Sequence, residues 1–348
     1  MPTSPPFLTW RPLSAALFAV VLLGCASTGA PPQRWSDDYL EAMRLPPDQA
    51  EDQLTALAER APSPEQARDA RFELARFALR RGDIDEATQR FESLWNEGIE
   101  DHVTSRALYE SARLNIEHHG DRPAGIALLH RAIAQSAPWA GTELALAYLV
   151  KVERQADNSA GLIADLDRIA AGLLDPRLKA QLHLAVGELH AEELAAEEKA
   201  LAAYRQAALA CADCAAADEA LWRMAQIYQR HQNFEPARQA LSLVASRTEE
   251  SWFVGSYHSH RAADARFELG LLHLLFLDDY DAARDHFETF IDVFPHAQRR
   301  PEAAWHLVEI TRLSQSSSAY RRALRRFVRD YPDNRRRPMA ERRLSELS

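Results

Sequence analysis

The side chains of this 348-residue chain whose types and spacing could do chemistry are a cysteine pair and a histidine pair. Cys211 and Cys214 form a C-x-x-C spacing, which suits a disulfide, a redox motif or half of a zinc site. A closed zinc site needs four ligands, and only one such pair is present. His258 and His260 alternate in an irregular segment, and two imidazoles supply only part of a metal-ion shell. We therefore predict no metal site.

The short motifs of common catalytic sites are missing from the sequence. It contains no G-x-G, H-E-x-x-H or G-x-S-x-G run, and its two G-x-x-x-x-G stretches lack the lysine of a P-loop. The acids Asp278 and Asp279 fit a polar turn better than a glycosidase pair. His183 and His190 lie in helical pattern, where solvated or packing roles are commonest. We expect no enzyme activity, no cofactor and no small-molecule substrate.

Composition indicates a helical protein with unevenly distributed charge. Hydrophobic residues make up 47% of the chain and glycine only 12 residues, which excludes disorder and argues against an all-β fold. The net charge of −10 argues against nucleic-acid binding. Residues 299–348 nevertheless hold thirteen arginines and six acids, a local +7, which leaves −17 on residues 1–298. The tail and the body therefore need separate interpretations.

In the basic tail, one helix is expected to surround a buried stripe with arginines, and the stripe consists of Tyr320, Ala323, Leu324, Phe327 and Tyr331. The solvated face of a terminal helix is one explanation of those arginines. A surface for an acidic partner or an anionic polymer is the other.

Internal repetition reveals the elements that position these residues. The run ARFELA at 70–75 returns as ARFELG at 265–270, and each copy is followed by a short polar turn and a second helical stretch. Residues at which the paired helices would cross then recur every 37 or 38 residues, with one interval of 46. They are Ala87, Gly125, Ile163, Ala200, Ala237, Ala283 and Tyr320. Small side chains, which most of them have, let two helices approach closely.

This pattern resembles the tetratricopeptide repeat family, whose helix-turn-helix units repeat about every 34 residues. The resemblance covers roughly residues 65–345. It implies an all-α fold, a right-handed solenoid of about seven repeats, with helical repeats in 37–245 and again in 263–348.

An inserted segment, residues 246–262, separates the two stretches of repeats. It contains Trp252, Phe253 and Tyr257, and is too aromatic for an inert linker. These residues suggest either a lid packed on the solenoid or a contact with a partner.

Arrays of this family present the first helix of each unit along a concave surface, which implies protein partners. Aromatic residues recur on these helices at Phe72, Trp222, Phe267 and Trp305, and packing between neighbouring repeats explains any one of them best. The candidates for a partner-binding groove on the same helices are Arg76, Arg80, Trp222, Gln226, Arg230 and Arg312.

The N-terminus predicts export. The apolar run from Leu13 to Gly24 spans about 18 Å as a helix, too short for a hydrocarbon core of about 30 Å, and it fits a signal peptide, residues 1–24. Its end, Leu-Leu-Gly-Cys, resembles the lipobox of bacterial lipoproteins, which implies lipidation of Cys25. Residues 25–36 would follow as a flexible tether. Ala26 implies sorting to the outer membrane, where the acyl chains would anchor the protein facing the periplasm.

Export would place the C-x-x-C pair in an oxidising compartment. Both cysteines fall in the turn after the helix that contains Ala200, so we predict a local disulfide between Cys211 and Cys214. Thioredoxin-like activity is the alternative, although no βαβ pattern surrounds the pair.

The lipobox together with the F-x-x-F-I-x-x-F-P ending of residues 287–295 resembles the outer-membrane lipoproteins related to BamD and the repeat domain of the Tol-Pal coordinator protein. The resemblance implies a lipid-anchored periplasmic scaffold or adaptor that binds envelope proteins, as in outer-membrane protein assembly. The alternative is a structural spacer subunit of a secretion, pilus or Tol-Pal-type complex. About seven repeats exceed the BamD pattern, and no coiled-coil heptad precedes them.

Overall fold

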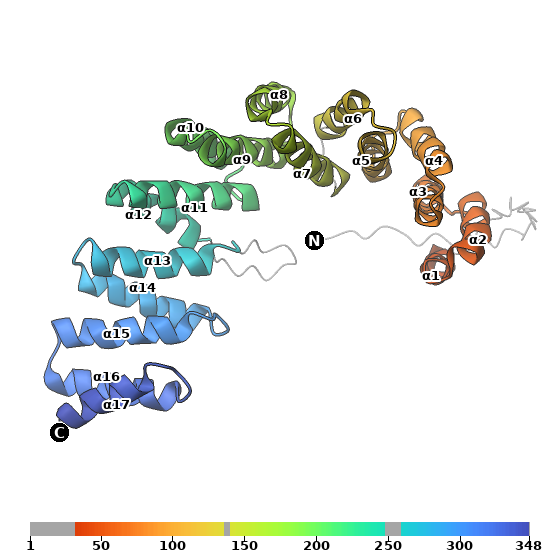
Figure 1. Cartoon of the computed structure of the whole chain (residues 1–348). Coiled ribbons are helices and arrows are strands. Elements are labelled where there is room, and N and C mark those ends of the chain that lie inside the picture. The colour runs from red at the N-terminus through yellow and green to blue at the C-terminus, as the bar shows by residue number, and fades with distance from the viewer. Residues whose placement is uncertain (1–31, 136–139, 248–258, 348) are drawn as a thin grey trace, which may run out of the picture. The chain divides into compact units, whose positions relative to one another are not determined.

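The computed structural model describes residues 32–135, 140–247 and 259–347. All regular elements in these residues are α-helices, so the predicted all-α fold is confirmed (Figure 1). The helices are α1 (Pro32–Ala42), α2 (Pro47–Glu59), α3 (Pro64–Arg81), α4 (Ile84–Asn96), α5 (His102–Glu117), α6 (Arg122–Ala134), α7 (Ala140–Gln155), α8 (Ser159–Gly172), α9 (Pro176–Glu192), α10 (Glu197–Ala210), α11 (Ala215–Arg230), α12 (Phe234–Ala245), α13 (Ala262–Leu275), α14 (Tyr280–Val293), α15 (Arg300–Ser314), α16 (Ser317–Asp330) and α17 (Arg337–Glu346).

The chain forms two compact units, residues 1–77 and 78–348, and each is described by itself. In the first unit, α1, α2 and most of α3 share a core. Trp35 of α1 is 4% exposed, and its indole N–H donates to the carbonyl of Leu57 at 2.9 Å. This anchoring explains why α1 begins at Pro32, inside the segment that we expected to be a tether.

The second unit consists of antiparallel helix pairs followed by α17. The seven crossing residues predicted from the sequence lie in the even-numbered helices α4 to α16, and all are buried. Within this unit the sequence thus located the pairs from α5/α6 to α15/α16, whereas it missed the pair α1/α2 of the first unit. Tyr320, Leu324 and Phe327 are buried on α16 as predicted, whereas Ala323 and Tyr331 are only partly buried.

Small residues allow the close approach within a pair. At Gly187 of α9, a Cβ would lie 2.4 Å from the ring of Tyr204 on α10. At Gly270 of α13, it would lie 2.7 Å from the ring of Phe287 on α14. In both pairs the aromatic ring occupies the space that a side chain on the first helix would fill, which couples a glycine on one helix to an aromatic residue on the next.

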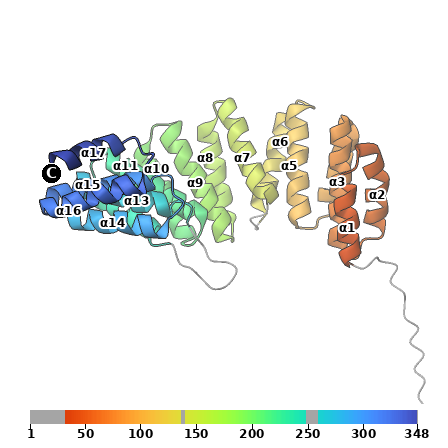
Figure 2. The same ribbon diagram turned by 90° about the horizontal axis from the view of Figure 1, so that it is seen from below.

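The pairs place odd- and even-numbered helices on different sides of the second unit. Figure 1 shows α5, α7 and α9 along one side and α6, α8 and α10 along the other, and Figure 2 shows α5 to α9 as a row. We call the surface formed by α5, α7, α9, α11, α13 and α15 the odd-helix face. It is the surface that the first helix of each pair was expected to present.

Candidate functional site

The order of buried and exposed residues along α11 shows how the sequence builds the odd-helix face. Leu221, Met224 and Ala225 are buried in the core between α11 and its neighbours. Residues one or two positions away along the helix, among them Arg223 and Gln226, therefore point away from that core. They line a groove of about 450 Å³.

Two grooves lie on either side of α9. The first, of about 440 Å³, lies between α7 and α9 and is lined by Glu143, Leu146, Ala147, Val150, Arg154, Gln181, Leu184, Ala185 and Glu188. The second lies between α9 and α11 and is lined by Ala191, Glu192, Tyr204, Arg223, Gln226, Ile227, Gln229 and Arg230. Each combines apolar side chains with charged ones, and each is large enough for one or two side chains of a bound polypeptide.

Carboxylates of α9 connect the two grooves. Arg154 of the first groove pairs with Glu192 of the second at 3.0 Å, and Arg223 of the second lies 3.6 Å from Glu188 of the first. Burial raises the pKa of Glu188, and the negative charges of Glu192 and Glu219 add to this effect, while Arg223 opposes it. Glu188 is thus a carboxylate whose charge is only partly compensated, at the border between the grooves.

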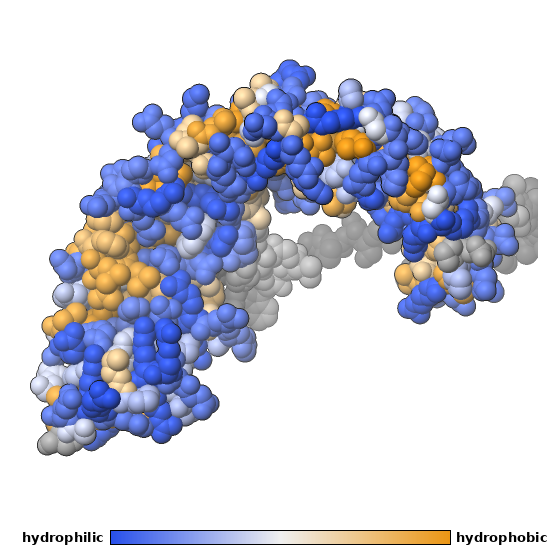
Figure 3. Space-filling model, in the orientation of Figure 1, coloured by the Kyte–Doolittle hydropathy of each residue, from blue (hydrophilic) through white to orange (hydrophobic). Residues whose placement is uncertain are grey.

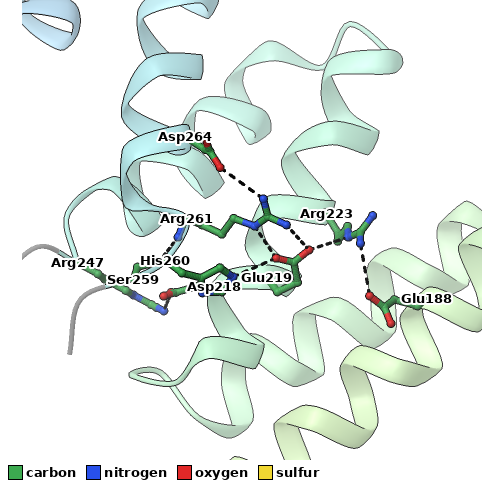
Figure 4. A network of polar contacts seen from close by, with 9 residues as sticks. All are labelled: Glu188, Asp218, Glu219, Arg223, Arg247, Ser259, His260, Arg261 and Asp264. Carbon is green, nitrogen blue, oxygen red and sulfur yellow. Dashed lines mark hydrogen bonds and ion pairs between the residues drawn. The ribbon is translucent and has the colours of Figure 1, made fainter. Parts of the chain in front are cut away.

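Glu219 of α11 is the centre of the polar network at the next junction (Figure 4). Its carboxylate accepts from Arg223 Nε at 2.9 Å and from Arg261 Nε and Nη2 at 2.6 and 3.0 Å, and His260 lies at 3.4 Å. Burial would raise the pKa of Glu219, but the hydrogen bond and charge of Arg261, with the charge of Arg223, outweigh it and hold the pKa below its usual range. Arg261 also reaches Asp264 at 3.4 Å.

Arg261 belongs to a contact that recurs between repeats. Its guanidinium lies 5.3 Å from the ring centroid of Trp222, on the preceding odd helix. Arg299 lies 3.5 Å from the ring of Phe267, and Arg336 lies 5.6 Å from the ring of Trp305. Each arginine is the N-cap residue of its odd helix, and we call the contact the arginine latch.

The latch explains the aromatic residues of the odd helices. As expected, Trp222, Phe267 and Trp305 pack between neighbouring repeats, since the next repeat supplies a cation to each ring. Sequence reasoning did not find the arginines. A signal existed, because Arg261, Arg299 and Arg336 are spaced by 38 and 37 residues, like the crossing residues.

The ends of the inserted segment are fixed to α11. Arg247 forms an ion pair with Asp218, which is fully buried, and the Ser259 amide donates to the Arg247 carbonyl at 3.2 Å. α12 ends at Ala245, directly before the predicted insert, and α13 begins at Ala262, the last residue of that insert. The aromatic candidates Trp252, Phe253 and Tyr257 lie outside the described residues.

The structure brings together three of the predicted groove residues. Trp222, Gln226 and Arg230 share α11, but Trp222 is covered by the latch, and Arg230 pairs with Glu197 of α10 at 2.7 Å. Gln226 is exposed in the second groove.

The other three predicted groove residues lie on different helices. Arg76 pairs with Glu73 of the same helix at 3.0 Å and belongs to the first unit, whereas Arg80, also on α3, is exposed in the second unit. Arg312 pairs with Glu309 on α15 at 2.9 Å. Sequence reasoning missed the residues of α7 and α9 that line the grooves, and α7 belongs to one of the weaker copies of the repeat.

Cys211 and Cys214 lie in the α10–α11 turn, where the sequence placed them. Both are thiols in this structure, and Cys214 Sγ lies 3.2 Å from the Cys211 carbonyl, to which it donates. Burial raises the pKa of Cys211 to about 12, and the hydrogen bond with Cys214 adds to the effect. The disulfide stays a prediction. Cys25 lies outside the described residues.

In the described ranges, no three side chains of His, Cys, Asp or Glu are grouped as a metal ion would require. His260 pairs with Glu219, and His258 lies outside those ranges. None of the described helices combines the length and the apolar character needed to cross a bilayer.

Exposed apolar side chains gather at the α13–α14 turn. Leu275, Phe276 and Leu277 are 59%, 53% and 37% exposed, and Phe276 stacks on Phe234 with ring centroids 4.6 Å apart. Figure 3 shows apolar surface over this end of α13.

A family model for the tetratricopeptide repeat matches residues 219–247 and 264–297, the pairs α11/α12 and α13/α14. Among curated proteins, none matches the chain.

Several solved structures are similar in fold. The PilF structure of Pseudomonas aeruginosa is 15% identical, with a TM-score of 0.38, over 68% of this chain and 96% of that one. A signal-transduction ATPase of Pyrococcus horikoshii with a tetratricopeptide repeat sensor is 15% identical, with a TM-score of 0.47, over 90% of this chain and 48% of that one. The apo form of the quorum sensor NprR of B. thuringiensis is 13% identical, with a TM-score of 0.40, over 90% of this chain and 91% of that one.

Proposed function

For a chain that contains tetratricopeptide repeats, we propose the function of a protein-binding scaffold whose odd-helix face holds a segment of a partner protein. The observation that carries the proposal is the pair of adjoining grooves on either side of α9. Their apolar side chains would receive apolar side chains of the partner, and their charged rims would fix its register through hydrogen bonds and ion pairs.

The charges of the grooves indicate how a partner would be recognised. The arginines that line the grooves already pair with carboxylates of a neighbouring helix, Arg154 with Glu192, Arg223 with Glu188 and Arg230 with Glu197. A partner therefore gains little from adding an acidic group at these positions. Glu188 differs, because burial raises the pKa of its carboxylate and the charges of Glu192 and Glu219 add to this effect, although Arg223 lies 3.6 Å away. A basic side chain of the partner beside Glu188 would compensate that charge.

We further propose that the scaffold is anchored by a lipid on Cys25 in the bacterial outer membrane and faces the periplasm. This part is supported by the sequence alone, through the apolar run that ends in Leu-Leu-Gly-Cys. The partner would then be another envelope protein, in outer-membrane protein assembly or a related complex. Labelling with a fatty-acid analogue tests the anchor, and Cys25→Ala is expected to abolish the label.

Photo-crosslinking in cells tests the groove. A photoreactive residue at Gln226 or at Ala185 is expected to give an adduct of one and the same mass, because both positions line the grooves. The same residue at Ala164, which is exposed on α8, is the control and should give none.

A blocking substitution separates the scaffold from a simple spacer. Ala185→Trp fills the groove between α7 and α9 and should abolish the adduct at Gln226, whereas Ala164→Trp should leave it intact. Adducts that form equally well at Ala164, or that survive Ala185→Trp, would show that the grooves do not hold the partner. The spacer role would then be the better explanation.

A further inference from the structure

A row of arginines on α16 differs from the other arginines of the second unit. Arg322, Arg325, Arg326 and Arg329 are exposed, and their spacing of three and four residues places them on one side of the helix. Arg329 pairs with Asp330 at 2.7 Å, but within the described residues no ion pair is formed by Arg322, Arg325 or Arg326. We call these four residues the arginine row.

Elsewhere in this unit, several arginines of the odd helices pair with acids nearby. Arg113 pairs with Glu110 at 2.9 Å, and Arg223 pairs with Glu219 at the same distance. On α16 no acidic residue precedes Asp330. The positive charges of the row therefore repel one another, and an acidic ligand would relieve that repulsion.

The arginine row borders a groove formed by α14, α15 and α16. Its volume is about 550 Å³, and its apolar lining includes Ile291, Leu307 and Phe327. Arg326 belongs both to the row and to the groove, so the charged ridge and the apolar floor are continuous. Arg300 lines the same groove, and its Nε has no hydrogen-bond partner.

The rim of this groove decides between two kinds of acidic ligand. Glu288 and Asp292 of α14 line it opposite Arg326 of α16. A lipid surface or a polyphosphate, negative throughout, would meet repulsion from these two carboxylates, and a flat membrane could not reach the apolar floor between two helices. A polypeptide can set carboxylates against the arginines and apolar side chains against the floor, with no negative charge beside α14.

We propose that the arginine row and the adjoining groove form a second docking site, which binds an acidic amphipathic segment of a partner protein. None of its residues lines the two grooves beside α9, so it does not depend on the function proposed for the odd-helix face. Guanidinium groups bind carboxylates through paired hydrogen bonds, and the apolar floor would orient the segment.

Binding of a synthetic peptide to the purified full chain tests the site. The probe is a helical peptide with glutamates on one face and leucines on the other, and the same peptide with lysines in place of the glutamates is its control. Fluorescence anisotropy should show binding of the glutamate peptide, weakening with salt, and none of the lysine peptide. If the glutamate peptide fails to bind the unaltered chain, the proposal is overturned.

Three variants locate the binding. The double variant Arg322→Glu/Arg326→Glu should lower the affinity for the glutamate peptide at least tenfold. Ala304→Phe, which fills the groove without changing the charge, should lower it by as much. Arg335→Glu/Arg342→Glu makes the same charge change at exposed arginines outside the row and should have less than a threefold effect. Circular dichroism spectra and melting curves establish that each variant is folded.

Phosphatidylglycerol vesicles distinguish a lipid surface from a peptide. We expect them not to displace the glutamate peptide at moderate salt. If the vesicles displace the glutamate peptide, and if the Ala304→Phe variant still binds that peptide with full affinity, the arginine row is a lipid-binding surface and the proposal is overturned. Equal effects of the two double-arginine variants would show a non-specific response to net charge, which also overturns it.

Discussion

Replacing Arg261 with alanine tests the arginine latch, because this residue joins α13 to α11. It donates two hydrogen bonds to Glu219, at 2.6 and 3.0 Å, and covers the ring of Trp222. Hydrogen bonds to a charged group contribute about 1.5–3 kcal/mol. A cation over an aromatic ring adds about 0.5–1 kcal/mol. Since Glu219 keeps Arg223, we expect a loss of about 2 kcal/mol at the α11/α13 junction.

Hydrogen exchange is the appropriate assay, because a repeat array loses stability locally at the interface that is altered. A loss of about 2 kcal/mol corresponds to roughly 30-fold faster exchange for amides of α13 that open together with the junction. Amides of α5 and α6 should not change. Arg238→Ala is the matched control, since its partner Glu235 is exposed and the pair lies within α12.

The pH dependence gives a second measure of the same latch. The folded pKa of Glu219 lies below its usual range, so its ion pairs stabilise the fold at neutral pH, and this contribution is lost as the pH falls below the ordinary glutamate range and through the folded pKa. Arg261→Ala should reduce that loss. If exchange in α13 changes less than twofold, or if Arg238→Ala has an equal effect, the latch does not couple the repeats.

Three more outcomes are expected. Gly187→Ala forces a methyl group into the ring of Tyr204 and should cost about 1–3 kcal/mol in urea unfolding, whereas Gly172→Ala, which meets no atom within 4 Å, should cost nothing. Burial, with the charges of neighbouring cationic groups, lowers the pKa of His286 to about 4. The unfolded chain therefore takes up a proton there as the pH falls below about 6.5 while the fold does not, so stability should decline between pH 7 and pH 5, and His286→Gln should flatten that decline. With its pKa raised to about 12, the reduced Cys211 thiol should react with iodoacetamide at pH 8 far more slowly in the folded chain than in urea; equal rates would contradict its burial.

The sequence determined the helix pairs of the second unit, because close helix crossings require small or specially fitted residues at a fixed interval. Ala87, Ala200, Ala237 and Ala283 are buried where that interval placed them. The pair α1/α2 has such a residue too, since Ala50 of α2 is fully buried and lies 37 residues before Ala87, but the series was not extended to it. The indole of Trp35 secures the first helix of that pair. Nothing in the local pattern distinguished residues 32–36 from a tether.

The candidate site was only partly open to prediction from the sequence. Gln226 was found because its polar type on a strong repeat marks an outward position. Trp222 and Arg230 were predicted to bind a partner, but each contacts another residue of the chain instead. Those residues, Arg261 and Glu197, lie 39 and 33 positions away, and no local pattern reveals such contacts. The groove between α7 and α9 was missed because residues of two helices from different repeats line it together, which no pattern along one helix reveals.

What the sequence by itself determined is the helical class, the repeat interval and the uneven charge, since each follows from residue types along one chain. What only the tertiary structure decided is which charges remain without a partner. Arg223 and Arg326 are the same residue type on similar helices, yet carboxylates of two neighbouring odd helices surround the first, while the second lies beside an apolar groove. Ion pairing depends on distances between helices, and those distances are set by how the repeats stack.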